Sequence, residues 1–181
     1  MKIKYNAPVI LTYSLAAVVV LVVCSSSLVG RYFSSPEGLS FSNPHFYFRL
    51  VSYVLGHGSW SHLMGNLMII LLVGPLLEEK YGSGKVFEMI CVTAAVTALL
   101  NAFFFSTSLV GGSGIAFLLI LLGSFSNIRS GEIPLTFILI AVLFIGDEVV
   151  STLKIDRISQ FSHLAGGFAG ACYGFFRSSR E

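Results

Sequence analysis

The amino-acid sequence predicts an all-α polytopic membrane protein, a single domain over residues 1–181 built as a bundle of six transmembrane helices. Of the 181 residues, 55% are hydrophobic and only 11% are charged, whereas ordinary soluble domains carry roughly 25% charged residues. Apolar runs close to the ~20 residues that a bilayer core requires recur along the chain. The net charge is +2 with no run of either sign, so the composition excludes a nucleic-acid-binding domain.

The six helices are expected over residues 9–29, 59–77, 86–105, 113–126, 134–150 and 158–176. The first is an uncharged run that is too long for the apolar part of a signal peptide. Glu78, Glu79 and Lys80 end the second helix, and the third is the next apolar run after them. The fourth starts after two glycines and is short. Pro134 begins the fifth, where proline is favoured, and two arginines end the sixth.

The basic residues predict how this bundle is oriented. With a cytoplasmic N-terminus, seven lysines and arginines lie inside and four lie outside, which is the bias found in cytoplasmic loops. Both termini are then cytoplasmic, and the long connection over residues 30–58 is external. Its many aromatic side chains are typical of a segment that rests in the membrane interface.

Four polar side chains lie in helices that should be apolar. His62 and Asn66 lie in the first turns of the second helix, Ser113 begins the fourth, and His163 lies near the start of the sixth. Polar residues within spans are costly and therefore mark candidate functional sites. The three helices run in the same direction, so their first turns should lie at a similar depth on the external side. We expect the four side chains to meet in one pocket.

This set of residues fits nucleophilic catalysis. Ser113 would be the nucleophile and His163 its general base. The side chains of His62 and Asn66, four residues apart on one helix face, and unpaired N–H groups at the start of the fourth helix could bind an oxyanion. Three glycines allow a tight turn around the serine, namely Gly111, Gly112 and Gly114. No acid is placed to orient the histidine, which predicts a Ser–His dyad.

Each feature taken alone has a plainer interpretation. The glycine-rich segment around Ser113 could be an ordinary loop, the glycines of the last helix could serve only helix packing, and a membrane histidine could simply bond a neighbouring carbonyl. Gly166 and Gly170 begin a stripe of small residues that lets another helix pack closely, and this stripe could draw His163 toward the fourth helix. The matching depth of the features favours catalysis. Of the other histidines, we expect His45 to be solvated and His57 to fix local structure.

Other intramembrane chemistries are disfavoured. The sequence has no His-Glu-x-x-His string for zinc. Its only aspartates, Asp147 and Asp156, lie at or beyond the end of the fifth helix, whereas an aspartyl mechanism needs two carboxyls that share a site. A channel or transporter would call for mid-membrane charges, which are lacking.

Four motifs, in order along the chain, resemble those of the rhomboid intramembrane serine proteases in their minimal six-helix bacterial form. They are His62-Leu-Met-Gly-Asn66, Gly74-Pro-Leu-Leu-Glu, Gly111-Gly-Ser-Gly and His163-x-x-Gly166-x-x-x-Gly170, and the similarity covers residues 48–174. The resemblance implies that Ser113 is the nucleophile and His163 the base. It also implies that His62, Asn66 and the Ser113 amide bind the oxyanion.

The resemblance further implies a multi-pass protein of the bacterial inner membrane with its active site toward the external face. Its substrates would be single-span or polytopic membrane proteins, and its partners would include the lipid bilayer but no nucleic acid, metal or cofactor. Three residues depart from the family pattern. Phe48 precedes Arg49 where a tryptophan is usual, and Phe117 replaces a tyrosine that packs on the catalytic histidine. Ser162 stands where a small residue precedes that histidine, which is a mild change. The alternative is a catalytically silent rhomboid-like protein that binds transmembrane clients, and retention of Ser113 and His163 favours the enzyme.

Overall fold

The computed structural model describes residues 4–128 and isolated helical positions farther along the chain, at residues 135, 138–139, 142–143, 146, 167–169, 172 and 176. Every regular element within these residues is helical, as the sequence predicts. The elements are α1 (Pro8–Val23), α2 (Ser26–Tyr32), α3 (Pro44–Ser52), the 3-10 turn η1 (Tyr53–Leu55), α4 (Trp60–Tyr81), α5 (Ser83–Phe104) and α6 (Ser113–Ile128). The expected fifth and sixth helices fall largely outside the described residues, so the six-helix count stays a prediction.

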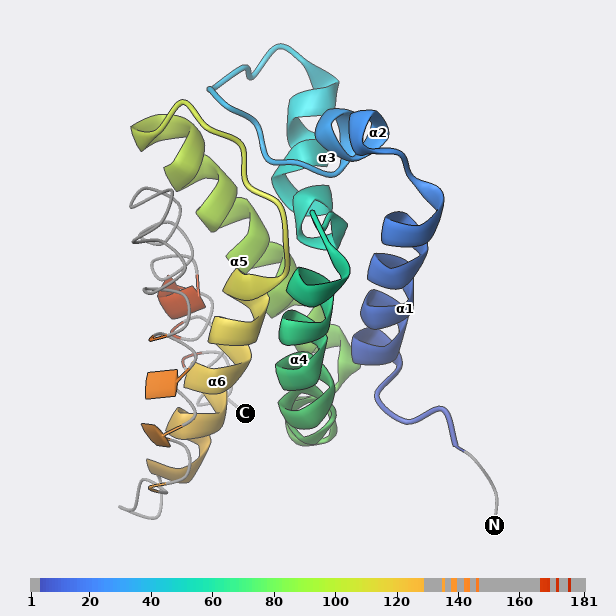
Figure 1. Cartoon of the computed structure of the whole chain (residues 1–181). Coiled ribbons are helices and arrows are strands. Elements are labelled where there is room, and N and C mark those ends of the chain that lie inside the picture. Colours follow the sequence, from blue (N-terminus) through green and yellow to red (C-terminus); the bar gives the residue numbers. More distant parts are fainter. Residues whose placement is uncertain are drawn as a thin grey trace.

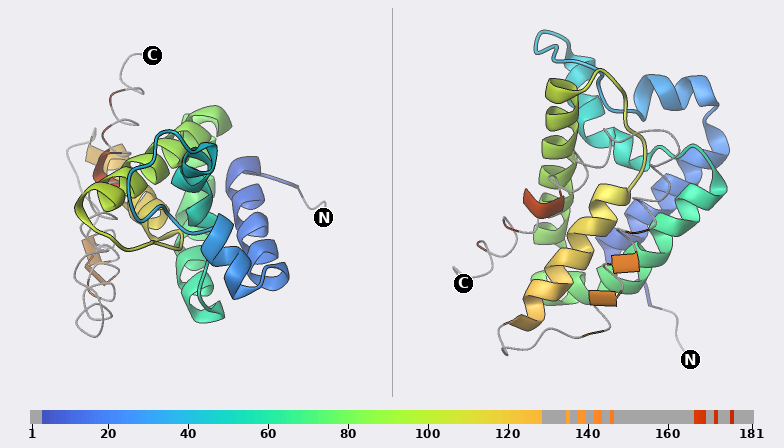
Figure 2. Two further views of the ribbon diagram at one scale, coloured as in Figure 1. Left: turned by 90° about the horizontal axis from the view of Figure 1, so that it is seen from above. Right: turned by 60° about the vertical axis from the view of Figure 1, so that its left-hand side comes forward.

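The longer helices stand side by side, while α2, α3 and their connections gather at one end of the bundle (Figure 1). A loop descends from the end of α5 into the bundle before α6 begins, as both Figure 1 and the right-hand view of Figure 2 show. Within the described residues, α4 and α5 are each 22 residues long and apolar enough to cross a membrane, and α1 is a shorter apolar helix. Large apolar side chains such as Val23, Met68 and Leu72 are exposed on these helices.

Helix α1 is shorter than the expected span over residues 9–29. The chain becomes extended at Cys24, and the side chain of Ser25 accepts a hydrogen bond from the Leu28 N–H at 3.4 Å. A serine in this position caps a new helix, which is why α2 begins separately at Ser26.

The start of α1 is held by a side chain from another helix. The N–H groups of Val9 and Ile10 donate to the two carboxylate oxygens of Glu78, each at 2.9 Å. The first N–H groups of a helix have no partner within it, and a carboxylate also complements the positive end of the helix dipole. Glu78 is buried, and it therefore ties the start of α1 to the end of α4.

The long connection over residues 30–58 contains a helix that we did not expect. Asn43 accepts a hydrogen bond from the His45 N–H at 3.0 Å, and Pro44 stands in the first turn of α3. An asparagine cap followed by proline is a typical helix start. His45 is half-buried in α3, with its ring edge-on to Tyr32 at 5.1 Å, so the expectation that it is solvated is wrong.

Helices α4 and α5 follow each other almost without a break. Gly82 has φ +83°, and its N–H donates to the Glu78 carbonyl at 2.9 Å. This left-handed backbone favours glycine and lets α4 continue to Tyr81 and α5 start at Ser83. The helices α1 and α4 approach closely at Gly74, where a Cβ would lie 2.7 Å from Cδ1 of Ile10.

Candidate active site

Ser113 is the first residue of α6 and is only 4% exposed. The residue two before it, Gly111, has φ +117°, a conformation that L side chains rarely adopt. The carbonyl of Gly112 accepts a hydrogen bond from the Ala116 N–H at 2.9 Å and so closes the first turn of the helix. The two glycines therefore let the chain turn sharply from the descending loop into the helix that carries the serine.

The loop before Ser113 is fixed by backbone hydrogen bonds to the long connection. The Gly111 N–H donates to the Tyr53 carbonyl at 3.1 Å. Leu109 bonds Ser35 twice, since its carbonyl accepts from the Ser35 N–H and its N–H donates to the Ser35 hydroxyl, both at 2.8 Å. Arg49 in turn donates to the Ser34 and Ser35 carbonyls at 2.8 Å. Arg49 thus acts on the loop indirectly, by holding the Ser34–Ser35 segment to which Leu109 is bonded.

His62 and Asn66 face this loop from the first turns of α4. The hydroxyl of Ser59 caps α4 by accepting from the His62 N–H at 3.2 Å. A Cβ on Gly111 would lie 2.7 Å from Cε1 and Nε2 of His62 and 3.6 Å from Nδ2 of Asn66. The structure therefore brings together the starts of α4 and α6, and the glycine is required because a side chain would collide with the imidazole.

His57, which the sequence analysis assigned to local structure, contacts the site directly. It is 2% exposed and precedes α4. Its Nε2 lies 3.1 Å from Nδ2 of Asn66 and accepts from the Gly112 N–H at 3.4 Å, and its Nδ1 lies 3.2 Å from the Leu55 carbonyl. The expectation that His57 fixes local structure is confirmed, but the structure that it fixes includes the nucleophile loop. Its position five residues before His62 was the available signal.

The imidazole of His57 is held in its neutral form. Burial, and after it the nearby imidazole of His62, with ring centroids 5.0 Å apart, lower the pKa of His57 from 6.5 to about 4. The hydrogen bond to the Leu55 carbonyl acts in the opposite direction. His57 lies outside the two candidate spans, in the turn that leads into α4.

A part of the chain beyond residue 160 returns to α6. Gly167 is buried, and a Cβ there would lie 2.5 Å from Cδ1 of Phe117, 3.2 Å from the Gly114 carbonyl oxygen and 3.2 Å from the Leu118 nitrogen. Such close approach of two helices is what small residues allow. The predicted stripe members Gly166 and Gly170 lie outside the described residues, as does His163, four positions before Gly167.

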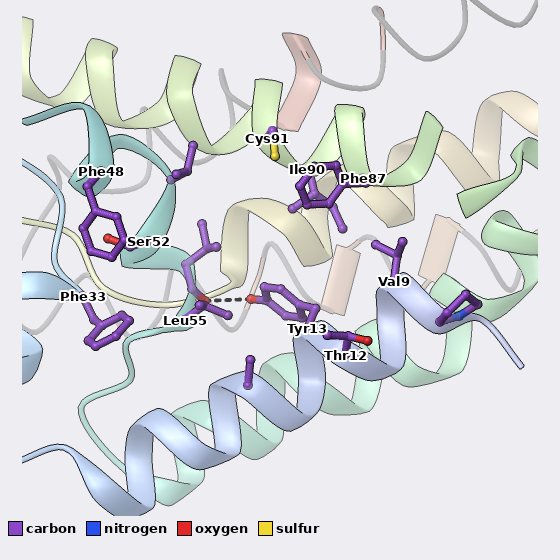
Figure 3. A pocket seen from close by; sticks show the side chains of 14 residues that line it. Val9, Thr12, Tyr13, Phe33, Phe48, Ser52, Leu55, Phe87, Ile90 and Cys91 are labelled. Atoms are coloured by element: carbon purple, nitrogen blue, oxygen red, sulfur yellow. Dashed lines mark hydrogen bonds between the residues drawn. The ribbon is translucent and has the colours of Figure 1, made fainter. Parts of the chain in front are cut away.

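An apolar cavity of about 520 Å³ lies among α1, α3 and α5 (Figure 3). Tyr13 lines it, and the Tyr13 hydroxyl donates to the Val54 carbonyl at 2.7 Å, the bond drawn dashed in the figure. A Cβ on Gly112 would lie 2.3 Å from the same hydroxyl oxygen. Tyr13 thus contacts both the cavity and the loop that carries Ser113. In the described part of the chain, no three side chains are grouped to hold a metal ion.

The family model of the Rhomboid domain matches residues 44–180. The chain therefore belongs to the rhomboid family, whose members are integral membrane proteins, and the apolar helices of the structure agree with this assignment.

Individual relatives are distant. The chain is 27% identical over 138 residues to Rhomboid-related protein 1 of Caenorhabditis elegans, covering 70% of this chain and 39% of that protein. It is 28% identical over 137 residues to RHOMBOID-like protein 2 of Arabidopsis thaliana, covering 70% of this chain and 41% of that protein. It is 23% identical over 133 residues to Rhomboid protease GlpG of Haemophilus influenzae, covering 72% of this chain and 69% of that protein. The matched part is thus about two fifths of each of the first two relatives.

Proposed function

We propose that this chain is an intramembrane serine endopeptidase that hydrolyses peptide bonds in or near the transmembrane segments of membrane proteins. The observation that supports this most is the placement of Ser113, buried at the N-terminus of α6 with His62 and Asn66 against its loop. The similarity to a relative that is named a protease adds support at the level of the family.

In this mechanism Ser113 Oγ attacks the carbonyl carbon of the scissile bond while His163 takes the hydroxyl proton. The new oxyanion accepts hydrogen bonds from the Ser113 N–H and from the side chains of His62 and Asn66. His163 then gives the proton to the leaving amine, and the C–N bond breaks to leave an acyl-enzyme. Water, activated by the same imidazole, hydrolyses this ester and restores the serine. No step requires a metal or a cofactor.

The proposal includes the orientation inferred from the basic residues. Both termini would be cytoplasmic, and the ends of α4 and α6 that meet at Ser113 would face the outside of a bacterial inner membrane. Substrates would be single-span or polytopic membrane proteins that reach the serine from the bilayer.

The test is cleavage of a single-span reporter protein in liposomes by the purified chain. Ser113→Ala and His163→Ala should each abolish the product and remain folded. Ser108→Ala is the matched control, because Ser108 is exposed on the same loop five residues earlier, and it should cleave as the wild type does. Cleavage by Ser113→Ala would overturn the assignment. A folded wild type that bound reporters without cutting any of them would favour the client-binding alternative.

A further inference from the structure

The buried imidazole of His57 has no step of its own in the proposed mechanism. Its hydrogen bonds determine which ring nitrogen carries the proton. The Gly112 N–H can only donate, so Nε2 must accept, and the amide nitrogen of Asn66 donates to the same atom. The Leu55 carbonyl can only accept, so Nδ1 must carry the proton. Partners on both sides of the ring therefore select one neutral tautomer.

This tautomer fixes two groups that face the candidate oxyanion position. An asparagine amide has two N–H groups and one oxygen, and its two orientations differ in what they present. With one N–H bound to His57, Asn66 keeps its second N–H for a ligand and turns its oxygen away from the imidazole. Gly112 is held on both sides, because its N–H donates to His57 and its carbonyl accepts from the Ala116 N–H. The Ser113 N–H belongs to the same planar peptide unit as that carbonyl, so holding Gly112 also sets the direction of the Ser113 N–H.

We propose that His57 is a positioning residue: its unprotonated Nε2 orients the Asn66 amide and, through Gly112, the Ser113 N–H, so that these two of the three oxyanion donors point at the reacting carbonyl. This inference rests on the proposed function. It predicts that removal of the acceptor lowers kcat and changes KM little, because donors that act on a developing oxyanion contribute mainly in the transition state.

Two substitutions separate the acceptor from the rest of the ring. His57→Gln keeps an acceptor oxygen near the position of Nε2, whereas His57→Asn places its amide near Nδ1 and has no atom at Nε2. We expect His57→Gln to keep kcat within about threefold and His57→Asn to lose about 10²-fold, the size of one lost oxyanion donor. His45→Gln is a matched control, since the His45 ring packs on the rings of Tyr32 and Phe48, and its kcat should be unchanged. In an Asn66→Ala background, His57→Asn should lower kcat by much less than 10²-fold, because the amide that His57 orients is already gone.

All variants are compared by thermal unfolding, so that loss of kcat is read only from folded protein. Full kcat in folded His57→Asn, or equal losses in His57→Gln and His57→Asn, would overturn the proposal.

A second measurement does not depend on activity. The ¹⁵N spectrum of histidine-labelled protein, with the His57 signals identified by their loss in His57→Gln, should show a protonated Nδ1 and an unprotonated Nε2 at pH 7. A proton on Nε2 would overturn this inference even in an active enzyme. An inactive wild type with the expected tautomer would instead refute the proposed function and leave the geometry of His57 intact.

Discussion

The contact between Gly112 and Tyr13 leads to a sharp prediction about the loop that carries Ser113. In Gly112→Ala, the new Cβ would lie 2.3 Å from the Tyr13 hydroxyl oxygen. The hydroxyl has to move by about 1 Å to reach an ordinary contact distance. It is held by its 2.7 Å bond to the buried Val54 carbonyl, so the movement breaks that bond.

The magnitude follows from the atoms involved. Leaving the Val54 carbonyl without its donor costs about 1–3 kcal/mol, and the forced repacking adds about 1–3 kcal/mol. We therefore expect Gly112→Ala to lower the free energy of unfolding by about 2–6 kcal/mol. In Tyr13→Phe the obstructing oxygen is gone. The nearest atoms to the new Cβ are then Cδ1 of Ile70 at 3.4 Å and Cζ of the ring at 3.5 Å, which are ordinary contacts.

The assay is a double-mutant cycle on four proteins: wild type, Gly112→Ala, Tyr13→Phe and the double variant. Reversible unfolding in mixed micelles gives the free energy of each. Tyr13→Phe alone should cost about 1–3 kcal/mol, and adding Gly112→Ala to it should cost less than about 1 kcal/mol. Gly65→Ala is the control glycine on α4, because a Cβ there meets nothing within 4 Å, and it should not lower stability.

Additive costs would refute the reasoning. If Gly112→Ala were as costly in the Tyr13→Phe background as in the wild type, the hydroxyl would not be the obstacle. The contact between α1 and the nucleophile loop would then not exist as described.

Three further predictions concern the groups that hold the site together. Glu78→Ala removes both acceptors at the start of α1 and should lower the free energy of unfolding by roughly 3 kcal/mol. The same change at the exposed neighbour, Glu79→Ala, should alter it by less than about 0.5 kcal/mol, and equal effects in denaturant unfolding would argue against the cap. Gly167→Ala should lower the unfolding temperature because its Cβ would lie 2.5 Å from Cδ1 of Phe117. Phe117→Val has no δ carbon, so Gly167→Ala should cost less in that background than in the wild type; an equal cost would mean that the collision lies elsewhere. Burial lowers the pKa of His57 from 6.5 to about 4, so between these pH values the unfolded chain binds a proton that the folded chain does not. The free energy of unfolding should therefore fall as the pH drops from 6.5 to about 4. An identical pH profile in His57→Gln would contradict this assignment.

That the starts of two helices meet could be predicted from the sequence, because each helix start carries its own local signal. His62 and Asn66 share a helix face by their spacing, and the glycines before Ser113 require a turn at the start of the next helix. The structure brings Gly111 against both side chains. The placement of His163 beside them remains a prediction, since it lies outside the described residues.

Other features could not be read, or were read incompletely, for physical reasons. The first helix ends at Val23 because Ser25 caps a new one, and one serine in an apolar run is a weak signal. The Asn43–Pro44 pair was a stronger signal for α3 that a loop interpretation overlooked. The role of His57 depends on contacts with Asn66 and Gly112. Contacts between residues 9 and 55 positions apart have no periodicity that a sequence pattern can show.

The central claim is that Ser113 is an activated nucleophile, and covalent labelling tests it most directly. The folded chain in detergent micelles is treated with a fluorophosphonate, digested and mapped by mass spectrometry. The account predicts one adduct, on Ser113, that is lost in His163→Ala and in denatured protein and kept in Ser108→Ala. Absence of an adduct on Ser113 in the folded wild type, or unchanged labelling of Ser113 in folded His163→Ala, would contradict it.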